Sequence, residues 1–318
     1  MQVLDRELPP ELETLHQEVV DLRPEATIKF VRGMPAGARL EGRHEPDREG
    51  NSEIRLNEGF EFATLTHQLL HALYFRRGFP FASVLPFETS FSTVAQIINC
   101  AVSHAAMHVE ARDKGLPPGL WRDKIVSLAT LEGPDEPVAS EQGILQAWYL
   151  ADALECDPDA VSELAQRCRD EYPQTWAITS KLNEVMARCR VMGGLRWRRA
   201  MVELLEYFDR LAREHYPDIL APLKSVSISL VMTEPQAARQ ADRMIEIVQS
   251  DPSVAGFQHK QDGSLFHFRY LGPGTQKKEL AELRSEVKRM RTEDFLNLYW
   301  VPYTVDIKAT ERPTASRR

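Results

Sequence analysis

Thr66-His67-Gln68-Leu69-Leu70-His71-Ala72 is the stretch that says most about the fold of this 318-residue chain. It lies within a run of helical periodicity, roughly Glu58 to Arg77, whose apolar side chains recur at helical spacing. The run closes with Arg76-Arg77-Gly78, and basic residues followed by glycine are what helix ends favour. On this helix the two histidines stand one turn apart. Both imidazoles therefore project from one face and can close on a single metal ion.

Zinc is the metal expected at such a pair of histidines. In the usual H-E-x-x-H arrangement of zinc peptidases, the glutamate takes a proton from the attacking water and hands it to the leaving amine. Gln68 occupies that position here. Glutamine has the shape of glutamate but no basic oxygen, so it can hold water and cannot act as the general base. We expect metal binding to survive and turnover to fall severely, whether Gln68 reflects natural decay of activity or a deliberate replacement.

A third ligand is expected from the next helical run, about Ser92 to Lys114, which Gly115 and the following prolines end. His104 is our preferred third ligand because it lies in the middle of that run. His108, one turn further along the same face, is the alternative ligand, or a group that supports the ligands or the substrate. Glu110 points elsewhere on the helix.

Cys100 stands one turn before His104 on the same face of this run. It has two interpretations: a small core residue, or a thiolate that caps the open position of zinc and keeps the site latent. The four cysteines form no CxxC pair, so we expect reduced thiols in a reducing compartment.

The span from Ile54 to Gly115 resembles the small gluzincin-like metallopeptidases of the ImmA/IrrE group, with a strand, the HQLLH helix, a loop and a ligand-bearing helix. The resemblance implies zinc ligation by His67 and His71, with Gln68 in the place of the catalytic glutamate. It also implies a protein substrate, such as a DNA-binding repressor, in a stress response or in antiviral defence. A histidine as third ligand departs from the acidic residue common in that group. The CapP-like peptidases of anti-phage signalling operons are a looser comparison.

The sequence predicts an α+β protein whose first part, residues 1–130, is a zincin-like metallopeptidase domain. Before the HQLLH helix we expect a helix over Glu11 to Leu22, strands over Thr27 to Val31 and Glu53 to Leu56, and a polar loop between the strands. The acidic, proline-marked segment Thr130 to Pro137 is the predicted linker. Residues 138–222 read as helical and are either a separate region or part of the peptidase domain. Helix breaks are expected at Asp157-Pro158, Tyr172-Pro173, Gly193-Gly194 and Pro217.

Residues 224–309 are predicted to form a C-terminal α/β sensor or regulatory domain. The expected order is βαββαβ, the ferredoxin-like arrangement. Its strands would be Val226 to Met232, Val254 to His259, Leu265 to Leu271 and Leu296 to Val305, and its helices Gln236 to Gln249 and Lys277 to Arg291.

The strand from Leu265 to Leu271 alternates aromatic side chains, Phe266, Phe268 and Tyr270, with His267 and Arg269. Aromatic groups beside basic ones suit single-stranded nucleic acid, through base stacking and phosphate neutralisation. The alternative is that the aromatic residues form the buried face of the strand, with the basic residues of the following helix balanced by its glutamates.

The hydropathy pattern and the net charge limit where the protein is expected to reside and which partners it is expected to bind. No stretch is apolar and long enough to span a membrane, and the N-terminal residues lack the apolar core of a signal peptide, so we expect a cytoplasmic protein. The net charge of −8 argues against extensive coating of nucleic acid.

Three functions are consistent with these features. The first is a zinc metallopeptidase that cleaves a specific regulatory protein, impaired here by Gln68, with Glu53 to Leu56 as an edge strand that pairs with extended substrate. The second is a non-catalytic zinc-binding regulatory protein. The third is a nucleic-acid-responsive scaffold.

Overall fold

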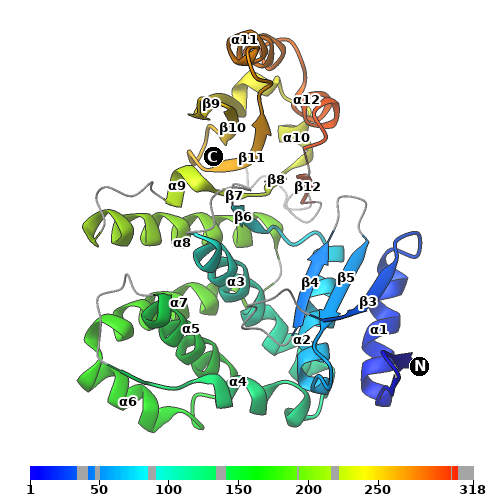
Figure 1. The fold of residues 1–318 in the computed structure, drawn as a ribbon, viewed down its shortest axis with the longest axis vertical. Coiled ribbons are helices and arrows are strands. Elements are labelled where there is room, and N and C mark those ends of the chain that lie inside the picture. Colours follow the sequence, from blue (N-terminus) through cyan, green and yellow to red (C-terminus); the bar gives the residue numbers. More distant parts are fainter. Residues whose placement is uncertain are drawn as a thin grey trace, which may run out of the picture. The chain divides into compact units, whose positions relative to one another are not determined.

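The computed structural model describes residues 1–33, 42–46, 51–84, 91–133, 141–191, 193–215, 222–301 and 303–306. The chain forms two compact units, each of which combines helices with small sheets (Figure 1). Unit 1 comprises residues 1–79, 103–135 and 145–190, and unit 2 comprises residues 80–102, 136–144 and 191–318. The predicted α+β class is confirmed. The predicted domain boundaries stay predictions.

Unit 1 begins with a short hairpin, β1 (Gln2–Val3) and β2 (Arg6–Glu7), and with helix α1 (Pro10–Leu22). Its main sheet has the order β3-β5-β4, formed by β3 (Ile28–Arg32), β5 (Ser52–Leu56) and β4 (Gly42–Pro46). Strand β3 runs parallel to β5, and β4 runs antiparallel to it. Helix α2 (Phe62–Arg76) contacts β4 and β5, and α1 packs against α2. The predictions for α1, β3, β5 and α2 are confirmed.

Strand β4 lies where we predicted a polar loop, and it changes the role of β5. The sequence did not reveal this strand, since apolar side chains do not alternate along Gly42-Arg43-His44-Glu45-Pro46. An edge strand of this kind gains much of its stability from backbone pairing with its neighbour, here β5. Strand β5 is therefore central, with a partner on each side. The prediction that Glu53 to Leu56 forms an edge available to substrate is wrong.

Glycine ends both helices that carry the predicted ligands, α2 and α3 (Ser92–Asp113). Gly78 and Gly115 have φ angles of 82° and 63°, in the left-handed region that side chains other than glycine rarely adopt. After α2, Phe79 N–H donates to Tyr74 C=O at 3.0 Å, and after α3, Leu116 N–H donates to Ala111 C=O at 3.0 Å. These bonds close the last turn of each helix in the Schellman arrangement.

The middle of the chain is helical, with breaks close to the predicted positions. Beyond the 3₁₀ turn at Pro118–Leu120, the helices are α4 (Arg122–Leu128), α5 (Glu141–Cys156), α6 (Ser162–Glu171), α7 (Pro173–Cys189) and α8 (Gly194–His215). A buried cluster that includes Leu150, Cys168 and Tyr172 joins α5 to α6 within unit 1. The predicted linker, Thr130 to Pro137, lies partly outside the described residues, and so does the predicted break at Pro217.

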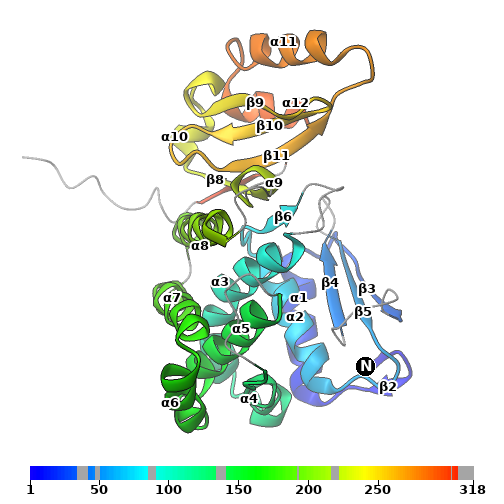
Figure 2. The same cartoon turned by 60° about the vertical axis from the view of Figure 1, so that its left-hand side comes forward.

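Unit 2 contains a five-stranded sheet of order β6-β7-β11-β10-β9 and a two-stranded pair, β12-β8. Antiparallel hairpins join β9, β10 and β11, whereas β11 runs parallel to β7. Figure 2 shows α11 and α12 over this sheet, where they share a core centred on Phe257, Phe266 and Phe295. The strands are β6 (Ala82–Val84), β7 (Val226–Ile228), β8 (Leu230–Met232), β9 (Ile245–Asp251), β10 (Val254–His259), β11 (Leu265–Tyr270) and β12 (Tyr303–Val305). The short helices are α9 (Pro222–Ser225), α10 (Glu234–Ala237), the 3₁₀ turn Ala241–Arg243, α11 (Gln276–Glu286) and α12 (Thr292–Leu298).

Two predicted elements of unit 2 are wrong. The helix predicted over Gln236 to Gln249 is only the short α10, because Ile245 and Ile247 alternate with exposed Glu246 and pair with β10 as strand β9. The strand predicted over Leu296 to Val305 is wrong at its beginning, which is the end of helix α12 with Leu296 in the core, and is confirmed only at Tyr303–Val305, which forms β12. The order βαββαβ is not observed, so a ferredoxin-like unit is not confirmed.

Among the described residues, no helix combines the length and the apolar character that a membrane span requires.

Candidate metal centre

Three imidazoles from two helices of unit 1 converge on one point. The Nε2 atom of His67 lies 2.7 Å from Nε2 of His71 and 2.9 Å from Nε2 of His104, and the last two atoms are 3.4 Å apart. His67 and His71 come from α2, and His104 comes from the half of α3 that belongs to unit 1. The two predicted ligands and the preferred third ligand are therefore brought together in a group that could hold a metal ion.

A metal ion such as zinc would need these nitrogen atoms slightly further apart than they lie. Zn–N bonds of about 2.0–2.1 Å in a tetrahedron place ligand nitrogens about 3.4 Å apart. The His71–His104 separation already has this value, and the other two are shorter. Closure around the ion would therefore require the His67 ring to move outward by less than about 1 Å. A single cation at the centre would satisfy three nitrogen lone pairs at once.

The rotation of α2 is set by its buried face. Leu65, Leu69 and Leu73 are fully buried in the core, whereas His67 and His71 lie on a half-buried face one turn apart. Apolar residues at four-residue spacing fix which face of a helix points inward, so the histidines cannot turn away together without exposing these leucines. The four-residue spacing of these leucines therefore determines the direction in which the two rings point.

Arg76 ties the end of α2 to the end of α1. Its buried guanidinium donates to the carbonyl oxygens of Val19 at 2.8 Å, of Ala26 at 3.0 Å and of Thr27 at 3.0 Å, with a longer bond to Arg23 at 3.3 Å. These carbonyls belong to the last turn of α1 and to the segment before β3, where backbone acceptors would otherwise be left without helix donors. A charged fork with several donors can satisfy them together, which fixes the position of α2.

Behind His104 lies a buried carboxylate that the sequence analysis missed. Asp152, on α5, accepts from Nδ1 of His104 at 2.9 Å and from Nε2 of His108 at 2.7 Å. All three side chains are buried, and the second half of α3 lies between α2 and α5 (Figures 1 and 2). His108 is therefore not one of the three converging ligands; it belongs to a second group behind them, with His104 and Asp152. The only sequence signal for Asp152 is a lone acid in an apolar stretch of helix.

Burial keeps two of the converging imidazoles, those of His67 and His71, neutral. It lowers the pKa of His67 to about 3, with a further lowering from His104 and His108 that Asp152 opposes. Burial likewise lowers the pKa of His71 well below its usual value. Neutral imidazole is the form that binds metals, so at neutral pH the site presents lone pairs rather than protons.

Asp152 remains a carboxylate despite its burial. Burial alone would raise its pKa, but the electrostatic influence of the His104 and His108 rings and the hydrogen bonds that they donate outweigh that effect and hold the pKa well below its usual range. The negative charge of Asp152 therefore lies on the opposite side of the His104 ring from the point where the imidazoles converge. It would partly offset the charge of a divalent cation.

Gln68 faces the edge strand. Its side-chain amide donates to the carbonyl oxygen of Gly42 on β4, at 3.4 Å, and the side chain is buried. A Cβ atom at Gly42 would lie 2.8 Å from Cγ2 of Thr64, so only glycine lets β4 approach α2 this closely. Two residues further along β4, Nε2 of His44 forms a hydrogen bond with Oγ of Ser52 at 3.0 Å. Burial lowers the pKa of His44 to about 4.

The remaining candidates lie outside the convergence point. Glu110 accepts from Nη1 of Arg77 at 2.9 Å and from the hydroxyl of Tyr74 at 3.3 Å, which makes it part of an ion-pair network. Cys100 is half-buried on α3 and belongs to neither metal-type group, so its predicted role as a cap on zinc stays a prediction. In unit 2, Phe266 is buried in the core and cannot stack on bases, whereas Tyr270 is exposed.

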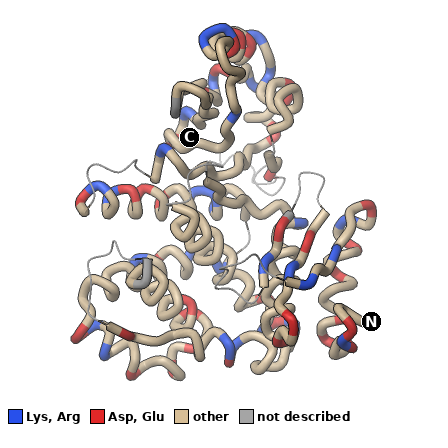
Figure 3. The backbone as a smooth tube through the Cα atoms, viewed as in Figure 1, with Lys and Arg blue, Asp and Glu red and all other residues tan. Residues whose placement is uncertain are grey.

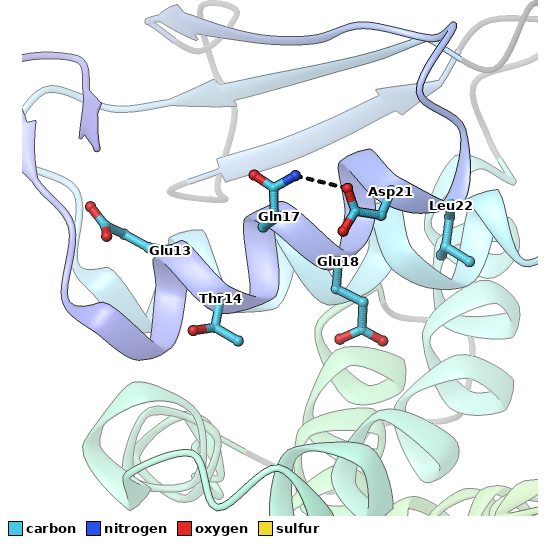
Figure 4. Close-up of a pocket in the computed structure, with 6 residues that line it drawn as sticks. All are labelled: Glu13, Thr14, Gln17, Glu18, Asp21 and Leu22. Atoms are coloured by element: carbon cyan, nitrogen blue, oxygen red, sulfur yellow. Dashed lines mark hydrogen bonds between the residues drawn. The ribbon is translucent and has the colours of Figure 1, made fainter.

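Among the described residues, neither the surface of α1 nor that of α11 brings together a group of side chains that could hold a metal ion. A shallow depression on α1 is lined by side chains of that helix alone, among them Glu13, Glu18 and Asp21 (Figure 4). Helix α11 has basic and acidic residues interleaved along its backbone (Figure 3), as in the alternative in which glutamates balance the basic residues. We therefore regard the histidine cluster as the candidate functional site.

Comparisons with protein-family models, with curated proteins and with solved structures found no match to this chain.

Proposed function

We propose that this chain is a zinc-binding protein of the metallopeptidase type, in which His67, His71 and His104 hold the ion. The observation that carries the proposal is the convergence of three Nε2 atoms within 3.4 Å of one another. The lowered pKa values of His67 and His71 keep these rings neutral, the form in which imidazole binds a metal ion. The proposed substrate is a protein, such as a DNA-binding repressor.

The chemistry expected at such a site is hydrolysis of a peptide bond. Zinc with three protein ligands supplies a Lewis acid that polarises a carbonyl oxygen and acidifies water. The residues of this chain would orient the reacting groups, and Gln68 would offer a hydrogen bond without accepting a proton. Hydrolysis would then lack its general base, so the expected rate is several orders of magnitude below that of a glutamate enzyme.

The strand proposed to hold an extended substrate is β4. It pairs with β5 along one edge, and among the described strands it has no partner on the other. Its residue Gly42 is linked to Gln68, which places this edge beside the helix that carries two of the ligands. An extended peptide can add to such an edge through backbone hydrogen bonds.

The second candidate is a non-catalytic zinc-binding regulatory protein, and the contact between Gln68 and Gly42 favours it. An amide nitrogen can donate to the carbonyl of Gly42, whereas a glutamate carboxylate would face that oxygen as a second acceptor. Gln68 thus serves the packing of β4 on α2 in a way that a catalytic glutamate could not.

Metal content tests the proposal directly. We expect about one zinc per chain in purified wild-type protein by elemental analysis after tag removal, and a loss of zinc in His67→Ala and in His104→Ala. His16→Ala is the matched control, since His16 is a partly buried helical histidine that packs on Phe30. Zinc that is absent from the wild type, or equally retained by all variants, would contradict the proposed site.

A further inference from the structure

The carboxylate of Asp152 contacts two imidazoles with its two different oxygen atoms. Oδ2 lies 2.9 Å from Nδ1 of His104, and Oδ1 lies 2.7 Å from Nε2 of His108. A carboxylate carries no proton to give, so each ring nitrogen must be the donor. Because His104 then carries its proton on Nδ1, its Nε2 atom keeps a lone pair directed at His67 and His71.

We propose that Asp152 is the positioning residue of the metal centre, which fixes the tautomer and the ring orientation of His104, with His108 holding the second oxygen of the carboxylate. This inference rests on the proposed zinc site. A ligating histidine whose second nitrogen donates to a carboxylate is both oriented and made a stronger base.

The geometry favours hydrogen bonds over a second metal ion between His104, His108 and Asp152. A carboxylate oxygen accepts hydrogen bonds, and the two ring nitrogens lie 2.7 and 2.9 Å from the carboxylate, the distances of charge-assisted N–H···O bonds. The two rings also approach different oxygens, rather than one shared point.

Aromatic side chains isolate this arrangement from water. The Trp148 ring, one turn before Asp152 on α5, lies 5.1 Å from the His104 ring, and the Trp121 ring lies 5.8 Å from the His108 ring. Both tryptophans are buried. In a dry setting a hydrogen bond to a charged group is worth more than in water, and losing one partner costs more. Helix α5 is therefore part of the metal centre, although Asp152 and His104 are 48 residues apart in the chain.

The test compares Asp152→Asn with Glu155→Gln in the full-length protein. Glu155 lies on the same helix with an equally buried carboxylate, but it pairs with Arg190 instead of a histidine. For Asp152→Asn we expect zinc affinity, measured by competition with a chelator, to fall about 10–100-fold. The visible spectrum of the Co²⁺-substituted protein should also change. Glu155→Gln should keep the wild-type affinity and spectrum.

A second measurement needs neither metal nor variant. Nitrogen NMR of the histidine rings in metal-free wild-type protein should show the proton of His104 on Nδ1, whereas a proton on Nε2 would overturn the inference. Wild-type affinity and spectrum in Asp152→Asn would also overturn it. Two ions per chain, one of them lost in Asp152→Asn, would make Asp152 a ligand and overturn it as well. Absence of metal from the wild type would overturn the zinc site alone, because the NMR result still decides the role of Asp152.

Discussion

The Nε2 atom of His104 lies 2.9 Å from the Nε2 atom of His67, although 37 residues separate the two in the chain. The buried Arg76 anchors α2, the helix that carries His67, and the ring of His104 donates a hydrogen bond to Asp152. Because these supports are formed by the protein itself, little ordering remains to be done when a cation arrives. The three rings are therefore positioned before any cation binds.

Zinc should stabilise the folded protein. An ion that binds only the folded state adds about 4 kcal/mol when its free concentration is 1,000 times the Kd. We expect the Tm of wild-type protein to rise on addition of zinc and to fall back on addition of a chelator. His71→Ala should lose this response, whereas His16→Ala should keep it. An equal response in both variants would place the bound zinc elsewhere.

The metal-free protein should lose stability in mild acid. Two buried histidines have lowered pKa values in the folded state, about 3 for His67 and about 4 for His44, against about 6.5 in the unfolded chain. As the pH falls from about 6.5 toward 4, the unfolded chain takes up protons that the folded protein does not, so the free energy of unfolding decreases. Each group contributes up to about 1.4 kcal/mol per pH unit.

Urea unfolding at several pH values in the presence of a chelator measures this slope. His44→Phe keeps an aromatic ring near Phe75 and removes one of the two groups, so its stability should depend less steeply on pH than that of the wild type. Identical slopes for the two proteins would show that His44 is not held neutral by burial.

Gly42→Ala should push β4 away from α2. The new Cβ would lie 2.8 Å from Cγ2 of Thr64, and overpacking of this kind costs about 1–3 kcal/mol. Because Thr64→Ser removes the clashing methyl group, the double variant should regain part of the loss in urea unfolding. Gly119→Ala is the control, since the nearest atom to a Cβ there is 3.9 Å away. A Gly42→Ala variant as stable as the control would show that the strand can shift freely.

Loss of Arg76 should be costly. Arg76→Met removes the donor of several bonds to buried carbonyls at the end of α1, and hydrogen bonds to a charged group contribute about 1.5–3 kcal/mol each. We expect a loss of at least about 3 kcal/mol in the free energy of unfolding. Arg167→Gln removes an exposed pair with Glu171 and a long cation–π contact with Tyr172, and it should change the free energy of unfolding by no more than about 1 kcal/mol.

The convergence of the candidate ligands could be predicted from the sequence because their geometry is mostly local. Four residues make one helical turn, so the pairing of His67 with His71 follows from the chain itself. His104 required one further step, its place in the middle of the next long helix. The ends of both helices were also readable, because Gly78 and Gly115 adopt backbone angles that favour glycine.

The features that the sequence did not reveal depend on distant packing. Asp152 comes from a region that looked like a separate set of helices, and only tertiary structure brings it to His104. Strand β4 is polar and owes its existence to pairing with β5. The residues around Ile245 fit both a helical and an alternating pattern, and pairing with β10 decided for the strand. In each case a nonlocal backbone or side-chain partner outweighed the local signal.

Replacing Gln68 by glutamate is the change that separates a peptidase from a binding protein. A carboxylate at this position can act as a general base, a contribution typically of 10²–10⁴-fold to the rate. It would also face the carbonyl oxygen of Gly42 and lose the present bond, which favours rotation of the side chain away from β4.

If the protein is of the metallopeptidase type, zinc-loaded Gln68→Glu should cleave a co-encoded regulatory protein that the wild type leaves intact. The double variant His67→Ala/Gln68→Glu should not cleave it, because the glutamate then lacks the metal. Cleavage by the double variant would point to a contaminating protease. A zinc-loaded Gln68→Glu protein that binds the regulator without cutting it would instead favour the non-catalytic function, in which the contact between Gln68 and Gly42 holds the edge strand in place.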